Sequence, residues 1–281
     1  MSEIQPSNSP AQENVSSSPQ ESVNDAPILL RNDCNGVVTL TLNRPDKYNA
    51  LSEALLDRLH EELEQIAQDD HARVVVINAN GKAFCAGHDL KQMRKDSKRA
   101  DLERLFARCS TVMQCIGALP QPVIAAVNGV ATAAGCQLVA TCDLAITSDQ
   151  ARFAVSGINI GLFCSTPAVA LSRAVGKKQA LEMLMLGDFI DAHKAADIGL
   201  VNRVVHHDSL AEETETIANA LAEKLPSAMA LGKSLFYRQL TQPLDAAYAT
   251  ASEAITCNFL NPDTLEGIDA FLEKRPPAWK R

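Results

Sequence analysis

Two uninterrupted apolar runs set the strongest limit on how this chain can fold. They are "RVVVINA" at residues 73–79 and "PVIAAVNG" at residues 122–129. Neither run alternates polar with apolar residues, which is typical of strands that are covered on both faces. Such strands belong to parallel sheets, whose neighbouring strands need crossover connections, usually helices. The two runs therefore predict an α/β fold around a buried, mainly parallel sheet.

The segments around these runs fit that architecture. Residues 27–44 are expected to form two strands about an Asn-Gly turn, closed by Pro45. Residues 53–66 place leucines at helical spacing behind Ser52, a suitable N-cap. Further expected elements are a helix over 101–118, a helix of small residues over 133–142 and a strand over 143–148.

The pattern becomes helical beyond residue 166, with a break at Gly176 and one last short strand at 200–206. From Asp208 onward, we expect helices over 208–225, 227–240, 243–259 and 263–273, punctuated by Pro226, Pro243 and Pro262. The chain is thus expected to divide into a tail (1–26), an α/β core (27–205) and a helical region (206–281).

The first 26 residues are rich in Ser, Pro, Gln and Asn and hold four acidic residues but no Lys or Arg. This composition predicts a disordered tail and argues against a mitochondrial presequence, which would be rich in arginine. Eight cysteines are scattered without a CxxC pair, which favours reduced thiols. These features together predict a cytoplasmic protein.

Composition also argues against several partners. A net charge of −8 disfavours nucleic acid, and no apolar run is long enough for a membrane span. The pair His206-His207 is interpreted as part of a solvated turn. We therefore expect no nucleic-acid partner, no membrane partner and no metal site.

The stretch "GKAFCAGHDL" at residues 81–90 points to a functional site. The small residues Cys85, Ala86 and Gly87 follow a predicted strand and precede His-Asp and a helix. The ends of strands that run into helices are where α/β folds build sites. Asp89 has Gln92 three residues further on, which predicts a helix N-cap rather than a catalytic acid.

Five stretches together resemble the enoyl-CoA hydratase/isomerase (crotonase) family in order and spacing. They are "LNRPDKYNALS", "GKAFCAGHDL", "PVIAAVNGVATAAGCQLVATCDLAI", "ALEMLMLGDFIDAHKAADIGLVNRVV" and "EGIDAFLEKR", and they span roughly residues 28–275. The resemblance implies a crotonase-like spiral of ββα units with a C-terminal helical trimerisation layer. It also implies a homotrimer or dimer of trimers in fatty acid metabolism that acts on acyl-CoA thioesters. Coenzyme A would be part of the substrate, with no separate cofactor.

The resemblance also implies a site. The main-chain N–H groups of His88 and Ala134 would hold the thioester oxygen as an oxyanion hole, and Gly135 would open a helix behind them. Close approach to main-chain donors requires small neighbours. The residues implied near coenzyme A are Lys47, Ala86, His88, Asp89, Lys91, Phe271 and Lys274. Without the resemblance, Lys47 and Lys274 would be interpreted as solvated charges.

The chain departs from the family at two positions. Hydratases of this family handle water with two glutamates, and the corresponding residues here are Gln137 and Gly157. Neither can exchange a proton near neutral pH, so hydratase activity is expected to be weak or absent. Gln137 could still hold a water or an acyl carbonyl through its amide.

Other residues could act instead. Cys164 or Ser165 could supply a nucleophile, but the favoured interpretation is that Ser165 or Thr166 caps a helix ahead of Pro167. The His88 side chain could be a base or a hydrogen-bond donor, or could lie outside the site. Cys85 and Cys136 are interpreted as packing residues.

Three functions are open at this point. The first is an acyl-CoA enzyme, either a weak hydratase or another lyase, hydrolase or decarboxylase. The second is a non-catalytic acyl-CoA-binding protein. A scaffold that binds no coenzyme A is the least favoured, because the small residues around Gly87 and Gly135 would then serve no purpose.

Overall fold

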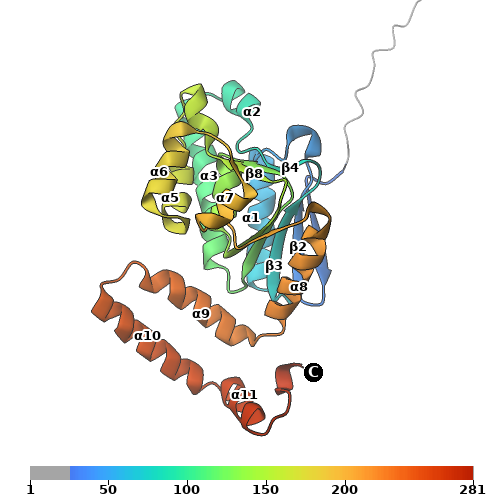
Figure 1. Ribbon diagram of the computed structural model, residues 1–281, viewed down its shortest axis with the longest axis vertical. Coiled ribbons are helices and arrows are strands. Elements are labelled where there is room, and N and C mark those ends of the chain that lie inside the picture. Colours follow the sequence, from blue (N-terminus) through green and yellow to red (C-terminus); the bar gives the residue numbers. More distant parts are fainter. Residues whose placement is uncertain (1–25, 281) are drawn as a thin grey trace, which may run out of the picture.

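A six-stranded sheet forms the centre of the protein (Figure 1). In the computed structural model, which describes residues 26–280, its strands are β1 (Leu29–Cys34), β2 (Val37–Leu42), β3 (Val74–Ala79), β5 (Val123–Val127), β7 (Leu144–Ser148) and β10 (Arg203–Val205). Their order in the sheet is β1-β2-β3-β5-β7-β10. Only β1 and β2 pair antiparallel, and every other neighbouring pair is parallel. The predicted parallel sheet is confirmed.

Side chains of β3 and β5 are buried on both faces of this sheet. Val75 and Ile77 belong to the core formed with α1 (Glu53–Ala67) and α3 (Arg99–Ala118). On the opposite face, Val74, Val76 and Ile124 pack beneath α8 (Leu210–Ala222). Since successive residues of a strand face opposite sides, two covered faces account for the missing polar alternation.

A second, smaller sheet supplies the other strand of each repeated strand–strand–helix unit. It contains β4 (Ala83–Cys85), β6 (Val130–Thr132), β8 (Arg152–Ala154) and β9 (Ile190–Asp191), in that order. The first three of these strands directly follow β3, β5 and β7 in the chain. The helices that come after them are α2 (Leu90–Lys95), α3, α4 (Ala134–Thr141), α5 (Ser165–Ala174), α6 (Lys177–Leu186) and α7 (Ala192–Asp197). The chain therefore repeats a strand–strand–helix turn, as the family resemblance implied.

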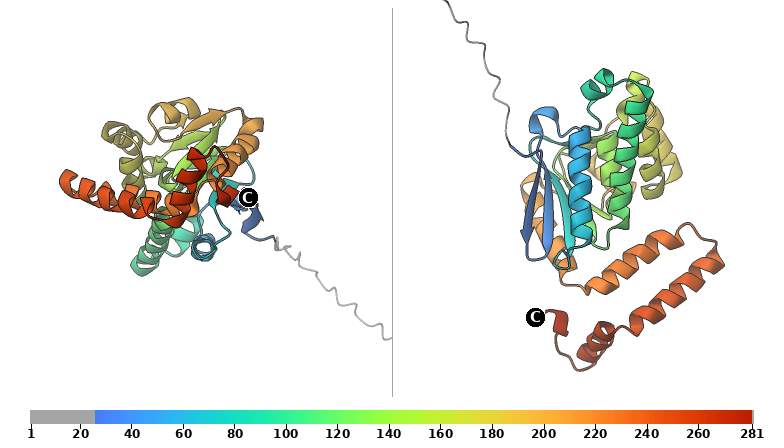
Figure 2. Two further views of the ribbon diagram at one scale, coloured as in Figure 1. Left: turned by 90° about the horizontal axis from the view of Figure 1, so that it is seen from below. Right: turned by 180° about the vertical axis from the view of Figure 1, so that it is seen from behind.

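The last three helices leave the body of the molecule. They are α9 (Pro226–Gln239), α10 (Leu244–Phe259) and α11 (Pro262–Leu272), and they extend away from the two sheets (Figures 1 and 2). No residue of α9 or α10 is buried, and large apolar side chains such as Leu244 and Tyr248 are exposed. The C-terminal helical region is confirmed, while its division from the core at residues 205 and 206 stays a prediction.

An ion pair whose two side chains are largely covered joins α9 to the core. The Lys233 Nζ atom lies 2.6 Å from a carboxylate oxygen of Asp143, and it donates to the carbonyl groups of Ile116 at 2.8 Å and Gln121 at 3.0 Å. The Tyr237 hydroxyl donates to the other Asp143 oxygen at 2.7 Å. Burial lowers the pKa of Lys233, and Asp143 offsets part of that shift. The position of α9 therefore depends on satisfied polar groups as well as on packing.

The predicted tail lies outside the described residues, apart from Ala26. Over residues 26–280, no helix has the length and apolar character to cross a membrane. No group of three or more His, Cys, Asp or Glu side chains in that range could hold a metal ion. All eight cysteines are free thiols.

Candidate functional site

The end of β4 is hydrogen-bonded to a loop that follows β2. The Ala86 N–H donates to the Tyr48 carbonyl at 3.0 Å. Leu51 bonds to the residues on either side of His88, because its N–H donates to Gly87 at 2.8 Å and its carbonyl accepts from Asp89 at 3.3 Å. In this parallel pairing, the main-chain groups of His88 itself face away from Leu51. The His88 N–H has no acceptor in the described part of the chain.

The start of α4 lies against the same segment. Ala133 adopts φ 51° and ψ −119°, a backbone conformation that is costly for a residue with a side chain. Ala134 is the first residue of α4, so its N–H has no acceptor within the helix, and it has none elsewhere in residues 26–280. Such backbone strain is often found at functional sites.

Two glycines bring these segments together. A Cβ atom on Gly87 would lie 2.9 Å from the Ala133 Cβ atom and 3.2 Å from the Ala134 nitrogen. A Cβ atom on Gly135 would lie only 2.0 Å from the Cys85 carbonyl oxygen. Only glycine fits at either place without a shift of the backbone. The structure thus brings together the residues around His88 and Ala134, which the family resemblance implied as a pair.

Two side chains of this region, those of His88 and Gln137, have buried polar atoms without hydrogen-bond partners in residues 26–280. Neither ring nitrogen of His88 makes a hydrogen bond, and both are buried. The imidazole packs edge-on against Phe106 of α3, with ring centroids 5.4 Å apart. Burial lowers the pKa of His88, and the nearby Leu51 carbonyl offsets part of the shift. Gln137 lies in α4, and its Oε1 atom is also buried without a hydrogen-bond partner.

The cysteines near the site are poor nucleophiles. Cys85 and Cys136 are completely buried, and burial raises the pKa of each thiol to about 12. Burial also raises the pKa of Cys164. Because the thiolate is the reactive form, these shifts disfavour attack by cysteine near neutral pH.

Ser165 does not cap α5. The helix begins at Ser165 itself, two residues before Pro167, and its N-cap residue Cys164 makes no side-chain capping bond. The Ser165 hydroxyl is exposed and donates back to the Phe163 carbonyl at 3.3 Å. The predicted cap at Ser165 is therefore wrong. The carbonyl that accepts the first bond of the helix is that of Cys164, from the Ala168 N–H at 3.0 Å, so Cys164 occupies the N-cap position.

Asp89 does cap a helix, as predicted. One of its carboxylate oxygens accepts from the Lys91 N–H at 3.2 Å and the Gln92 N–H at 3.3 Å, and the other lies 3.3 Å from the Arg44 guanidinium. Gln92 does not complete a capping box, since its side-chain oxygen accepts from Glu53 instead.

Lys47 lies on the loop that pairs with Ala86. It is exposed, in a short 3-10 turn from Pro45 to Lys47. Tyr48 and Asn49 follow in the left-handed region, with φ values of 50° and 54°. The buried Asn49 amide fixes the loop by donating to the carbonyls of Asn80 and Ala83 at 2.9 and 2.8 Å. The sequence analysis did not identify Asn49 or Phe106, because only their contacts show their part in the site.

Phe271 and Lys274 are not brought to this site within one chain. They lie at the end of α11, at the opposite end of the molecule from α2 (Figures 1 and 2). Phe271 is 82% exposed, and Lys274 adopts a left-handed φ of 57° just beyond the helix.

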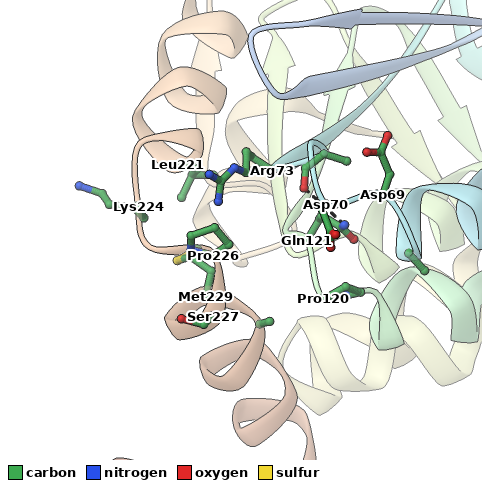
Figure 3. A pocket seen from close by; sticks show the side chains of 13 residues that line it. Asp69, Asp70, Arg73, Pro120, Gln121, Leu221, Lys224, Pro226, Ser227 and Met229 are labelled. Carbon is green, nitrogen blue, oxygen red and sulfur yellow. Dashed lines mark hydrogen bonds between the residues drawn. The ribbon is translucent and has the colours of Figure 1, made fainter. Parts of the chain in front are cut away.

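Two of the cavities in residues 26–280 are notable for their polar lining or their size, and both lie away from the candidate residues. One, of about 240 Å³, opens where the chain passes from α8 to α9 and contains Asp70, Arg73 and Gln121 (Figure 3). The Gln121 amide donates to the Ile66 carbonyl at 2.9 Å, and its oxygen has no partner. The other, of about 870 Å³, lies between α8 and the open part of the large sheet. Neither is lined by His88, Ala134 or Gln137.

Comparison with known proteins identifies the family. The chain matches the enoyl-CoA hydratase/isomerase family over residues 32–281, and it belongs to that family. Within the family it is similar to enoyl-CoA hydratase domain-containing protein 3. The rat protein of that name, designated mitochondrial, is 46% identical over 245 residues, which is 87% of this chain and 82% of the rat protein.

Solved structures confirm the crotonase fold. The human enoyl-CoA hydratase domain-containing protein 3 is 45% identical with a TM-score of 0.88, and the match covers 90% of this chain and 100% of that one. An enoyl-CoA hydratase of Mycobacterium smegmatis is 56% identical with a TM-score of 0.89, covering 91% and 100% of the two chains.

The predicted cytoplasmic location is contradicted by these relatives. The similar rat, frog and human proteins are all named mitochondrial. The prediction rested on free cysteines and on the acidic first 26 residues. Free cysteines argue only against an oxidising compartment, and they do not separate one reducing compartment from another.

Proposed function

We propose that this chain binds acyl-CoA thioesters and polarises the thioester carbonyl with the N–H groups of His88 and Ala134. The observation that carries the proposal is the tight contact of Gly87 and Gly135 with the neighbouring segment, beside two N–H groups that have no acceptor. Unpaired N–H donors in closely packed backbone are suited to an oxyanion. Family membership supports the thioester as the ligand class.

The chemistry follows from charge development. When the carbon next to the carbonyl loses a proton, or when a nucleophile attacks the carbonyl, negative charge moves onto the carbonyl oxygen. Two fixed N–H donors stabilise that charge without reorganising, and loss of one such donor typically slows turnover about 10²–10³-fold. The N-terminal end of α4 adds a favourable dipole behind Ala134.

Coenzyme A is proposed to lie along the loop at Lys47 and the segment Ala86–Lys91. Phe271 and Lys274 would contact it only from a neighbouring copy, since their own chain holds them at the other end of the molecule. A homotrimer or dimer of trimers would allow this. The unburied helices α9 and α10, with their exposed apolar side chains, support such an assembly.

Binding of acyl-CoA is the direct test. Titration with butyryl-CoA should saturate, and Gly87→Ala should weaken the affinity about tenfold, or ~1.4 kcal/mol, because its Cβ would push against the Ala134 amide. Gly199→Ala is the matched control. Gly199 has the same kind of φ, 83°, but a Cβ there would meet only one atom, 4.0 Å away. Failure of the wild-type chain to bind any acyl-CoA would remove the proposal.

Hydration of crotonyl-CoA should be slow. Of the two substitutions that would introduce the glutamates, only the one at residue 137 should be tolerated by the fold. Gln137→Glu should fold, because the two side chains have nearly the same shape. Gly157→Glu should destabilise the protein and restore nothing, because its Cβ would lie 2.4 Å from the Leu162 carbonyl oxygen and 2.8 Å from the Cys164 sulfur. Loss of crotonyl-CoA absorbance and thermal unfolding measure the two effects. Rapid hydration by the wild-type chain would show that our interpretation of the missing carboxylates is wrong.

A non-catalytic acyl-CoA-binding protein is the second candidate. The same two missing carboxylates favour it, since each general acid or base usually contributes about 10²–10⁴-fold. The candidates differ in whether any bound acyl-CoA is converted, which mass spectrometry of an acyl-CoA panel would determine.

A further inference from the structure

We infer that the His88 imidazole is a catalytic base that removes a proton from the carbon next to the thioester carbonyl. The inference rests on the proposed function, because it needs the carbonyl oxygen to be held by the His88 and Ala134 amides. The proposed oxyanion hole uses only the main-chain N–H of His88. The inference assigns a separate role to the side chain of the same residue.

The missing partners of the imidazole are the first support. A neutral imidazole has one donor and one acceptor, and a buried histidine that serves only packing normally satisfies them. Both His88 nitrogens are buried and unpaired, and the adjacent Asp89 carboxylate is occupied by the start of α2 and by Arg44. The Leu51 carbonyl lies close enough to influence the pKa of the ring but makes no hydrogen bond of proper geometry with it, so at least one ring nitrogen is left without a partner in residues 26–280.

The position of the imidazole is the second support. The imidazole belongs to the same residue as one of the two proposed donors. A thioester whose carbonyl oxygen accepts from the His88 N–H is therefore held close to the imidazole of that residue. The edge-on contact with Phe106 restricts the orientation of the ring. Gln137, whose carbonyl oxygen is also unpaired, can accept a hydrogen bond but cannot take up a proton near neutral pH. Of these three side chains, only His88 can act as the base.

Access requires a small movement, because the ring nitrogens are covered. The short helix α2 directly follows His88 and contains no buried residue. Its displacement would expose little core, so it is the segment we expect to move when a thioester enters.

The proton and the electrons balance without a further reactant. The C–H bond next to the carbonyl breaks, and its proton goes to the free imidazole nitrogen. Its electron pair forms the carbon–carbon double bond of an enolate, and the carbonyl π pair moves to oxygen, where the two N–H groups hold it. Return of a proton from the imidazolium restores the thioester. In D₂O, the imidazolium exchanges with solvent, so deuterium enters the substrate.

The experiment measures deuterium uptake into butyryl-CoA in D₂O by mass spectrometry, with binding measured in parallel. The wild-type chain should exchange the hydrogens next to the carbonyl faster than buffer does. His88→Gln should bind butyryl-CoA but exchange at least about 10²-fold more slowly, the usual contribution of a general base. Added imidazole should restore part of the exchange in His88→Ala, an effect that a purely structural histidine would not give.

His60→Ala is the matched control, because His60 lies on α1 beside Cys115 and Glu64, outside the site. Its exchange rate should equal that of the wild type. Binding without exchange above buffer, or undiminished exchange in His88→Gln, would overturn the inference and leave the proposed function standing. Absence of acyl-CoA binding in the wild-type chain would overturn both.

Discussion

Replacement of Asp143 by alanine should lower the free energy of unfolding by about 3–5 kcal/mol, the usual cost of removing one partner of a buried ion pair. The carboxylate accepts from Lys233, from the Tyr237 hydroxyl and from the Val123 N–H at 2.7 Å. Alanine would leave the Lys233 ammonium, whose side chain is 8% exposed, without a counter-charge. It would also leave the other two donors unpaired.

Urea unfolding of Asp143→Ala and Tyr237→Phe would separate the contribution of the ion pair to the free energy of unfolding from that of the Tyr237 hydrogen bond. The tyrosine variant removes one hydrogen bond and leaves the ion pair, so it should cost only about 1–2 kcal/mol. Arg99→Ala is the control for an exposed pair. Arg99 and Glu103 are 2.7 Å apart, but their side chains are 91% and 60% exposed, and the change should stay within about 0.5 kcal/mol. A loss for Asp143→Ala no larger than that of Arg99→Ala would contradict the role given to the buried pair.

This ion pair also shows what the sequence could not predict. Lys233 and Asp143 are 90 residues apart in numbering, and nothing in the stretch around Asp143 indicates that Lys233 is its partner. By contrast, the absence of polar alternation in residues 73–79 and 122–129 predicted two buried strands. A strand that is covered on both faces needs apolar side chains at successive positions, and this can be recognised from the sequence alone. The apolar spacing behind Ser52 and the break at Gly176 predicted α1 and the division between α5 and α6 for the same local reason.

The candidate site also has some features that the sequence predicted and others that it could not predict. Asp89 was predicted as a cap because capping needs only residues close in the chain, and its bonds to Lys91 and Gln92 confirm this. The obstruction at Gly157 and the contact of His88 with Phe106 depend on segments that meet only in the folded chain. The predicted cap at Ser165 is wrong because several residues in "CSTP" could begin a helix, and the structure has Cys164 at the N-cap position.

Gly135→Ala should be among the most damaging single changes in the chain. The new Cβ would lie 2.0 Å from the Cys85 carbonyl oxygen and 2.7 Å from its carbon, so main chain would have to move away from main chain. No rotamer can relieve such a contact. Overpacking of a core commonly costs about 1–3 kcal/mol, and we expect about 3 kcal/mol or more here because the obstacle is backbone.

The effect on binding should exceed the effect on folding. Separation of α4 from β4 moves the Ala134 N–H away from the His88 N–H, and acyl-CoA affinity depends on the two lying at one oxygen. We therefore expect Gly135→Ala to lose measurable butyryl-CoA binding even at temperatures where circular dichroism shows it folded.

Gly117→Ala is the matched control, because it is also a glycine-to-alanine change within a helix. Gly117 lies in α3, and a Cβ there would meet nothing within 4 Å. Alanine is favoured over glycine inside helices by about 0.5–1 kcal/mol, so this variant should be as stable as the wild type or more so, with unchanged affinity. If Gly135→Ala matched it in both stability and binding, close contact between α4 and β4 could not be what sets the distance between the two amides.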